Sequence, residues 1–398
     1  MANPTSREFR IPYFGQIGWA LLALAVCGFV VCGNKRSVMP CYQKACERWV
    51  DGRFLYDADG FGFVYLPNSL LAFAPFAVLP TLASELAWRV FNIFLMALGL
   101  RRLSRLIEGD NDWDLFGKAT FVCAPLCFSA ARNGQMTLAM TGAMMCAAVE
   151  LARQRWWRAA AWLGFAVVAK TLSVVLVLLA AAMYRKARLP IVAALALAFA
   201  LPFALQDTVY VTSQYIQCAE NVARSFDLGR ERHFATLFGA LQVAGAHAPP
   251  VVETVARGFM ALATLAACLA ALRRLPRERA TLYLVALATL YIVLFNPRTE
   301  SNTYAVLAPA LGLFFGLAYA EGRWLSAWSF LTIAACVVSN YEFCRLFSPV
   351  ESAIWLAPLA ASVFMVIVIR DLSLELSNAR GPREFAAPRV STAPRLAV

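Results

Sequence analysis

The stretch that decides the fold is RQRWWRAAAWLGFAVVAKTLSVVLVLLAAAMYRKAR, residues 153–188. Basic residues cluster at both of its ends, the run between them is apolar, and Lys170 stands at its centre. One long helix would bury the ammonium group in the middle of a bilayer, whereas two short helices meeting near Lys170 would return both basic clusters to one side. A lysine at mid-bilayer costs on the order of 3 kcal/mol on insertion scales, so it tends to be functional or paired.

The whole chain has the composition of a polytopic membrane protein. Of its 398 residues, 61% are hydrophobic and 15% are charged, whereas charged residues make up about a quarter of soluble domains. Each crossing needs roughly 20 apolar residues, so we expect one all-α transmembrane bundle over residues 1–375. It should contain about eleven to thirteen helices, short or re-entrant ones included. We also expect outer loops at 33–63 and 206–250 and a disordered cytoplasmic tail at 376–398.

The net charge of +12 does not indicate nucleic-acid binding, because lysine and arginine lie in short clusters between apolar spans rather than along one polar face. The clusters occupy residues 101–105, 153–158, 185–188 and 273–279. By the positive-inside rule all four are cytoplasmic, and so are both termini. The predicted location is a plasma membrane, of the bacterial inner-membrane kind, which the chain crosses several times.

The number of helices between residues 63 and 105 stays open. Pro75 and Pro80 break this segment into two apolar runs. If both runs cross the membrane, the basic cluster at 101–105 ends up outside. If the first run only dips into the membrane, as short broken segments can when they are buried in protein, the cluster stays inside.

A polar segment rich in aromatic residues follows the first apolar span. It reads NKRSVMPCYQKACERWVDGRFLYDADGFGFVYLP, residues 34–67, and its part 42–49 predicts one or two helical turns lying flat on the bilayer. Two interpretations are about equally compatible with this loop. It is a connector whose aromatic residues form an interfacial belt, or it grips a substrate, with rings to stack on sugars, cations for phosphate and a carboxylate for acid or base chemistry.

Two further polar segments lie on the same predicted side as this loop, the segment at 206–250 and the turn at 296–304. Together with Lys170 and the first loop, they hold nearly all of the polarity outside the basic clusters. Because the charge rule places these segments on the outer side, we expect a single site at the outer face.

The sequence predicts no metal site and requires no cofactor. Its two histidines are far apart, and no cluster of carboxylates lies near either of them to complete a set of metal ligands. The eleven cysteines include no C-x-x-C pair. Cys41 and Cys46 lie in the first outer loop, where they either form a local bridge in an oxidising compartment or remain two free thiols.

Several motifs, in their order and spacing, resemble glycosyltransferase family 87. They are W-V-D-G-R-F-L-Y-D at 49–57, F-V-Y-L-P at 63–67, A-P-F-A-V-L-P at 74–80, N-G-Q at 133–135 and R-W-W-R-A-A-A-W-L-G-F-A-V-V-A-K at 155–170. The resemblance runs from the first helix to about residue 186 and continues more weakly to the turn at 297–304. The family consists of integral membrane enzymes of the GT-C fold, among them polyprenol-phosphate-mannose-dependent α-(1→2)-mannosyltransferases.

The resemblance implies a GT-C bundle that moves a sugar, such as mannose or another hexose or a pentose, from a polyprenyl-phosphate donor to an extracytoplasmic lipid or glycan acceptor. One position departs from the family pattern. Relatives usually carry an aspartate, the expected catalytic base, where this chain has Val38. Another carboxylate has therefore taken over the role, or the chemistry is altered, or the chain is a GT-C scaffold that binds without catalysing. A transporter or flippase of lipid-linked sugars is a further alternative, although no internal repeat supports it.

The candidate catalytic carboxylates are the best-placed pair, Glu300 and Asp57, followed by Asp59 and Asp51. Each also has a structural interpretation, because Asp57 and Asp59 fit a glycine-terminated turn and Glu300 fits an ion pair with Arg298. Lys170 has the strongest case as a ligand of the donor phosphate, with Arg36 and Arg298 as further cations. The candidate substrate-binding residues are Tyr42, Tyr65, Asn133, Gln135, Tyr215, Asn302 and Tyr304.

Overall fold

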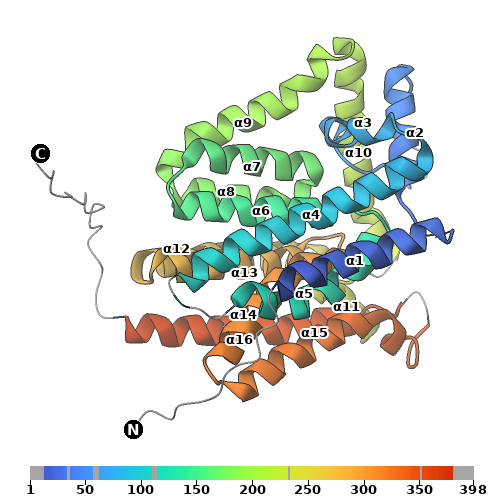
Figure 1. Cartoon of the computed structure of the whole chain (residues 1–398). Helices are drawn as coiled ribbons and strands as arrows, with labels where there is room; N and C mark the ends of the chain where they lie inside the picture. The colour runs from blue at the N-terminus through green and yellow to red at the C-terminus, as the bar shows by residue number, and fades with distance from the viewer. Residues whose placement is uncertain are drawn as a thin grey trace, which may run out of the picture.

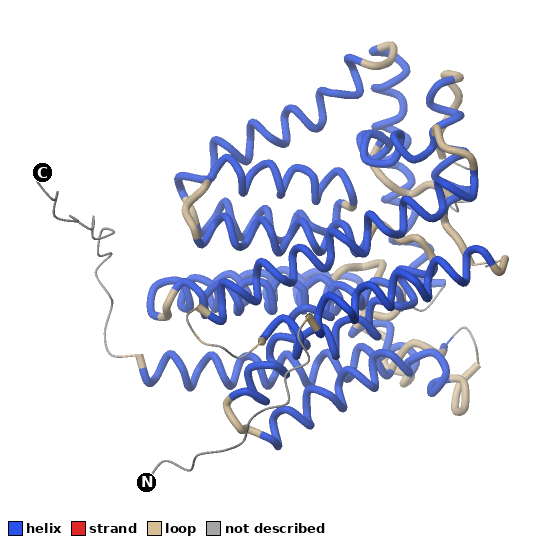
Figure 2. The backbone as a smooth tube through the Cα atoms, viewed as in Figure 1, coloured by secondary structure: helices blue, strands red, loops and turns tan. Residues whose placement is uncertain are grey.

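The computed structural model describes residues 13–33, 36–56, 62–109, 111, 114–231, 234–349 and 352–379, and for 224–231 it describes the backbone alone. Every regular element in these residues is helical, so the predicted all-α class is confirmed (Figure 2). The α-helices are α1 (Phe14–Val31), α2 (Met39–Val50), α3 (Leu70–Ala77), α4 (Thr81–Glu108), α5 (Leu115–Arg132), α6 (Thr137–Ala152), α7 (Trp156–Ala169), α8 (Val174–Met183), α9 (Arg188–Ala200), α10 (Thr208–Glu231), α11 (Leu237–Val243), α12 (Pro250–Arg274), α13 (Arg277–Phe295), α14 (Ala308–Ala320), α15 (Trp324–Cys344) and α16 (Leu356–Asn378). Short 3₁₀ turns join some of them: η1 (Pro67–Ser69), η2 (Thr171–Ser173), η3 (Arg185–Ala187), η4 (Leu201–Ala204) and η5 (Ser301–Leu307).

The central apolar stretch forms two helices, not one. α7 ends at Ala169, Lys170 has an extended backbone with φ −160° and ψ 127°, and α8 begins after the 3₁₀ turn η2. The rings of Trp156 and Tyr184, one from each end of the stretch, lie 5.8 Å apart. The chain therefore returns to its starting side, and the basic clusters at 153–158 and 185–188 lie together.

The segment after the first outer loop is also broken. α3 and α4 meet at an angle of 118° across residues 78–80. Proline is compatible with a helix start because the first N–H groups need no partner inside the helix, and Pro80 directly precedes α4. The eight residues of α3 span only about 12 Å, less than half of a hydrocarbon core of about 30 Å. α3 is therefore too short to cross a bilayer by itself.

All four basic clusters lie at one end of the bundle, called here the basic end. Arg102 on α4 and Arg155 both form ion pairs with Glu150 at the end of α6, which joins the clusters at 101–105 and 153–158. The junctions α8 to α9 and α12 to α13 lie at the same end, toward the left of Figure 1. α2, α3 and α10 lie at the other end, toward the right of Figure 1.

The outer surface of several helices is apolar. Five described helical segments are long and apolar enough to cross a membrane, or six if α3 and α4 count as one bent span. α9 and α12 carry exposed apolar side chains such as Leu197, Phe259 and Leu262, whereas α13 and Ser301–Ala320 are more than four-fifths buried. An apolar exterior around an apolar core is the arrangement of a multi-pass membrane protein.

Small residues allow the central helices to pack closely. A Cβ atom on Gly142 of α6 would lie 2.2 Å from the carbonyl oxygen of Leu95 on α4, and one on Gly312 of α14 would lie 2.6 Å from that of Ala119 on α5. Glycine at such crossings lets helix backbones touch, which is how helices associate where lipid leaves little hydrophobic driving force. The close contacts fix α4, α5, α6 and α14 as a rigid centre.

The described residues form more helices than the expected eleven to thirteen. Two spans are each broken into two helices, at residues 78–80 and at Lys170. In addition, the predicted outer loop at 206–250 consists largely of α10 and α11. At the other end of the chain, α16 continues to Asn378, and the rest of the predicted tail lies outside the described residues. Cys41 and Cys46 are free thiols.

Candidate active site

A cavity of about 390 Å³ opens at the end of the bundle opposite the basic end. Segments far apart in the sequence line it: α2, the stretch before η1, the break at Lys170, α10 and the turn before η5. Its lining residues are Val38, Cys41, Tyr42, Gly62, Val64, Tyr65, Gln135, Lys170, Thr171, Leu172, Asn221, Val222, Asn296, Pro297, Arg298, Glu300 and Thr303.

Lys170 reaches this cavity because the helix is broken at that position. The Oγ and N–H of Ser173 both donate hydrogen bonds to the Lys170 carbonyl, at 3.1 and 3.2 Å, and so start the next helical segment. The Nζ atom donates to the Thr137 hydroxyl at 3.2 Å. Among the described carboxylates none forms an ion pair with it, so a neutral hydroxyl holds the Lys170 side chain at the cavity.

The turn at 296–303 brings a cation and a carboxylate to the same cavity. The N–H of Ala235 donates to the Thr299 carbonyl at 2.8 Å, and Asn296 Nδ2 donates to the Arg298 carbonyl at 2.6 Å. These contacts fix the backbone and leave the side chains to the cavity. Arg298 Nη2 lies 3.9 Å from Glu300 Oε1, and the Glu300 side chain is 48% exposed. The carboxylate is therefore near a cation but not locked by a direct hydrogen bond.

Two phenols form a polar pair on the α2 side of the cavity. The Tyr42 hydroxyl donates to the Tyr65 hydroxyl at 3.0 Å, and the Tyr42 ring packs edge-on against Phe73. Burial raises the pKa of Tyr65 to about 12 and raises that of Tyr42 as well. Both phenols therefore stay protonated at neutral pH and contribute hydroxyl groups, not charge.

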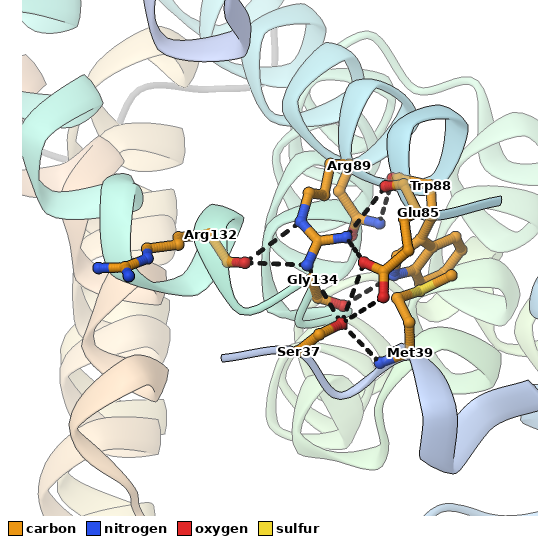
Figure 3. Close-up of polar contacts among 8 residues, drawn as sticks. Ser37, Met39, Glu85, Trp88, Arg89, Arg132 and Gly134 are labelled. Carbon is orange, nitrogen blue, oxygen red and sulfur yellow. Dashed lines mark hydrogen bonds and ion pairs between the residues drawn. The ribbon is translucent and has the colours of Figure 1, made fainter. Parts of the chain in front are cut away.

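A buried polar cluster lies behind this side of the cavity (Figure 3). Arg89 and Glu85 of α4 form an ion pair, and both contact the hydroxyl of Ser37. Arg89 also donates to the carbonyl of Arg132, the last residue of α5 before the turn that leads to α6. Trp88 Nε1 donates to the Gly134 carbonyl in the same turn, at 2.7 Å. One helix thus fixes both the approach to α2 and the turn that carries Gln135.

Six of the sequence-predicted residues meet at the cavity, while the others lie elsewhere or are not described. The six are Lys170, Arg298, Glu300, Tyr42, Tyr65 and Gln135. Asp57 and Asp59 lie outside the described residues. Asp51 is exposed and pairs with Arg53, and Arg36 is exposed as well.

Four predicted substrate-binding residues are not part of the lining and have structural contacts instead. The carbonyl of Asn133 accepts from the N–H of Val38 at 3.0 Å. Tyr215 donates to the Phe199 carbonyl at 3.2 Å, and the Asn302 side chain accepts from Ser129 at 2.7 Å. Tyr304 is buried, and its hydroxyl donates to the Ala235 carbonyl at 3.0 Å. These contacts hold the outer segments together.

Sequence reasoning did not single out several polar residues at the site. Asn221 and Thr303 line the cavity, and Thr137 holds Lys170. Thr137 follows the N-G-Q turn by two positions, and Thr303 belongs to the turn at 296–304. Their proximity to these polar turns was the feature of the sequence that could have identified them as site residues. No group of three or more metal-ligating side chains is found in the described part of the chain.

Comparisons with known proteins give one family. The description of glycosyltransferase family 87 matches residues 63–297, more than half of the chain. The matched range begins after α2 and ends before Glu300, so it covers neither Val38 nor the candidate base. Comparison with curated protein sequences gives no match. Among solved structures, the crystal structure of ArnT from Cupriavidus metallidurans bound to undecaprenyl phosphate matches 92% of this chain and 74% of that chain, with 16% identity and a TM-score of 0.40.

Proposed function

The chain belongs to glycosyltransferase family 87, and on this premise we propose that it moves a sugar from a polyprenyl-phosphate donor to a lipid or glycan acceptor. The observation that carries the proposal is the cavity itself. Two cations and one carboxylate, brought from distant segments, meet there beside neutral hydroxyl and amide groups. These are the parts that transfer from a phosphate leaving group requires.

The charge of the cavity favours a monophosphate donor. Among its described lining residues the charged ones are Lys170, Arg298 and Glu300, which sum to one net positive charge. A sugar linked through one phosphate is a phosphodiester with a single negative charge, whereas a diphosphate link carries two. A single positive excess among the described lining residues therefore matches the monophosphate.

We propose a role for each charged group in a direct displacement. Glu300 takes the proton from the acceptor hydroxyl as the oxygen attacks the anomeric carbon. The bond from that carbon to the phosphate oxygen breaks, and the anionic polyprenyl phosphate leaves toward Lys170 and Arg298, whose charges stabilise it. Because attack and departure occur on opposite faces, the anomeric configuration inverts.

Neutral groups at the cavity complete the proposed site. Gln135, Asn221 and Tyr65 present amide and hydroxyl groups suited to sugar hydroxyls. Apolar side chains of Val64, Leu172 and Val222 also line the cavity, which suits the first isoprene units of the donor. We propose mannose, another hexose or a pentose as the sugar, and an acceptor on the extracytoplasmic face.

The sidedness follows from the positions of charge. The cavity and the basic clusters lie at opposite ends of the bundle. Since basic clusters mark the cytoplasmic side of plasma membranes, we place the cavity on the extracytoplasmic side and the two termini in the cytoplasm.

A second candidate function rests on Val38. Its side chain lines the cavity at the position where the sequence motif of relatives has an aspartate, so an apolar group stands where a base is expected. A chain that lacked any replacement for that base would bind the donor without turning it over. Glu300 in the same cavity favours the enzyme.

The experiment that separates these functions uses purified protein in lipid nanodiscs. Polyprenyl-phosphate sugars labelled in the sugar are offered with a lipid extract as the acceptor source, alongside a diphosphate-linked donor. The proposal expects release of polyprenyl phosphate from a monophosphate donor, and none from the diphosphate. Saturable donor binding without release would support the binding scaffold, and absence of both binding and release would refute the proposed donor class.

A further inference from the structure

We propose that Arg89, Glu85 and Ser37 are positioning residues for the transfer reaction, which they serve without touching the substrate. The inference rests on the proposed function and deepens it. None of the three residues lines the cavity. They act through two backbone segments, residues 37–39 and 132–135, that carry one side of its lining.

Arg89 joins three segments through a single guanidinium group. Its side chain is fully buried. Nε and Nη2 donate to the Arg132 carbonyl at 3.2 and 3.0 Å, and Nη2 also donates to the Ser37 hydroxyl at 3.2 Å. Nη1 donates to the backbone carbonyl of Glu85 at 3.0 Å and to its carboxylate. Figure 3 shows the guanidinium between the α5–α6 turn and the segment that leads into α2.

Ser37 passes this constraint to the cavity. Its hydroxyl donates to the Glu85 carboxylate at 2.9 Å and accepts from the N–H of Met39 at 3.1 Å. The residue between them, Val38, donates its N–H to the Asn133 carbonyl at 3.0 Å. Both segments are therefore held against α4 and against each other. Val38 lines the cavity, as do Tyr42 farther along α2 and Gln135 at the end of the turn.

The use of a buried ion pair at this place supports a geometric role. Replacing a buried ion pair by packed apolar residues is often neutral or stabilising, so such a pair is weak evidence for a contribution to stability. The planar fork of an arginine, however, can hold a carbonyl, a hydroxyl and a carboxylate in fixed directions at once. A lysine at position 89 would supply the charge without the fork. Errors of about 1 Å in the placement of reacting groups can lower a rate by roughly 10²-fold.

The test compares two conservative variants with a matched control. Arg89→Lys keeps the charge and removes the fork, and Ser37→Ala removes one hydroxyl while leaving Arg89, Glu85 and Arg132 in place. The control is Arg257→Lys, because Arg257 and Glu253 on α12 form another partly buried ion pair four residues apart, and neither lines the cavity.

Three quantities are measured for each protein: kcat and donor KM for transfer, Tm, and the rate at which Cys41 reacts with a maleimide. Cys41 is a native reporter, since it lines the cavity and its N–H donates to the Val38 carbonyl at 3.1 Å. Cleavage after Lys44 separates it from Cys46, so mass spectrometry resolves the two thiols. Cys41 labelling needs no turnover and therefore reports on the positioning even if transfer is not observed.

We expect Ser37→Ala and Arg89→Lys to lower kcat by about 10-fold or more with little change in donor KM, and to speed Cys41 labelling. We expect Arg257→Lys to change neither. The inference is overturned if both positioning variants keep the kcat and the Cys41 reactivity of the unmodified protein, or if kcat falls only as far as the folded fraction does. If Arg89→Lys does not fold, Ser37→Ala decides alone. Failure of the unmodified protein to transfer any sugar would instead count against the proposed function.

Discussion

Replacement of Lys170 by methionine tests the donor phosphate site most directly. Methionine keeps an unbranched apolar side chain but removes the charge, and Thr137 remains to hydrogen-bond elsewhere. Two opposite charges about 4 Å apart interact by about 4 kcal/mol at the effective dielectric constant of a partly exposed protein site. Because the lysine lies at the break between α7 and η2 and is held against Thr137 of α6, it is already partly withdrawn from water, which reduces the further desolvation that would offset this attraction on binding.

The expected loss is therefore about 2–4 kcal/mol, which corresponds to a rise in donor Kd of roughly 30- to 1,000-fold. The measurement is equilibrium binding of a fluorescent polyprenyl-phosphate sugar to protein in nanodiscs, with Tm as the test of folding. Lys170→Arg should retain most of the affinity, since it keeps the charge. Lys186→Met is the matched control, because it removes the same group at the basic end, far from the cavity. A folded Lys170→Met protein whose donor Kd stays within twofold of the original would show that Lys170 is structural.

Three other predictions follow from the same structure. Glu300→Gln should lower kcat by about 10² to 10⁴-fold while donor Kd changes little, and a near-normal rate would move the base to Asp57, Asp59 or Asp51. An impermeant thiol reagent should label the Asp59→Cys variant in intact cells and the Ser391→Cys variant only after the cells are opened. The reverse labelling pattern would invert the proposed topology. Asn68→Leu should raise Tm. The Nδ2 and Oδ1 atoms of Asn68 are buried without a hydrogen-bond partner among the described residues, which costs about 1–3 kcal/mol of stability. A lower Tm would contradict this prediction.

The sequence indicated both main breaks in the fold, at residues 78–80 and at Lys170, each as one of two alternatives. The cost of a lysine at mid-bilayer and the common side of the basic clusters both favour two helices over one at 153–188, and the structure has two. The bend between α3 and α4 lies at Pro80, one of the two prolines that indicated a break, whereas Pro75 lies inside α3. These features depend on composition and on neighbours in the chain, which a sequence displays.

The positioning residues could not be predicted in the same way. Arg89 lies 43 positions from Arg132 and 52 from Ser37, and nothing in the local pattern of α4 shows which carbonyl its guanidinium meets. The same limit explains Tyr304, which belongs to a polar outer turn but points into the core. A sequence identifies polar turns that gather at one face, but the direction of each side chain depends on packing between distant segments.

Val38 and Glu300 together connect the fold to the chemistry. Both line one cavity, yet Val38 belongs to the segment fixed by α4, and Glu300 to a separate turn fixed by Ala235. In a direct displacement the acceptor oxygen, the anomeric carbon and the leaving oxygen lie on one line, and the base must reach the acceptor hydroxyl. With the phosphate held at Lys170, a base at residue 300 in place of residue 38 requires the acceptor to present its hydroxyl from a different direction. We therefore expect this chain to differ from relatives that carry the aspartate in the acceptor it uses more than in the donor it binds.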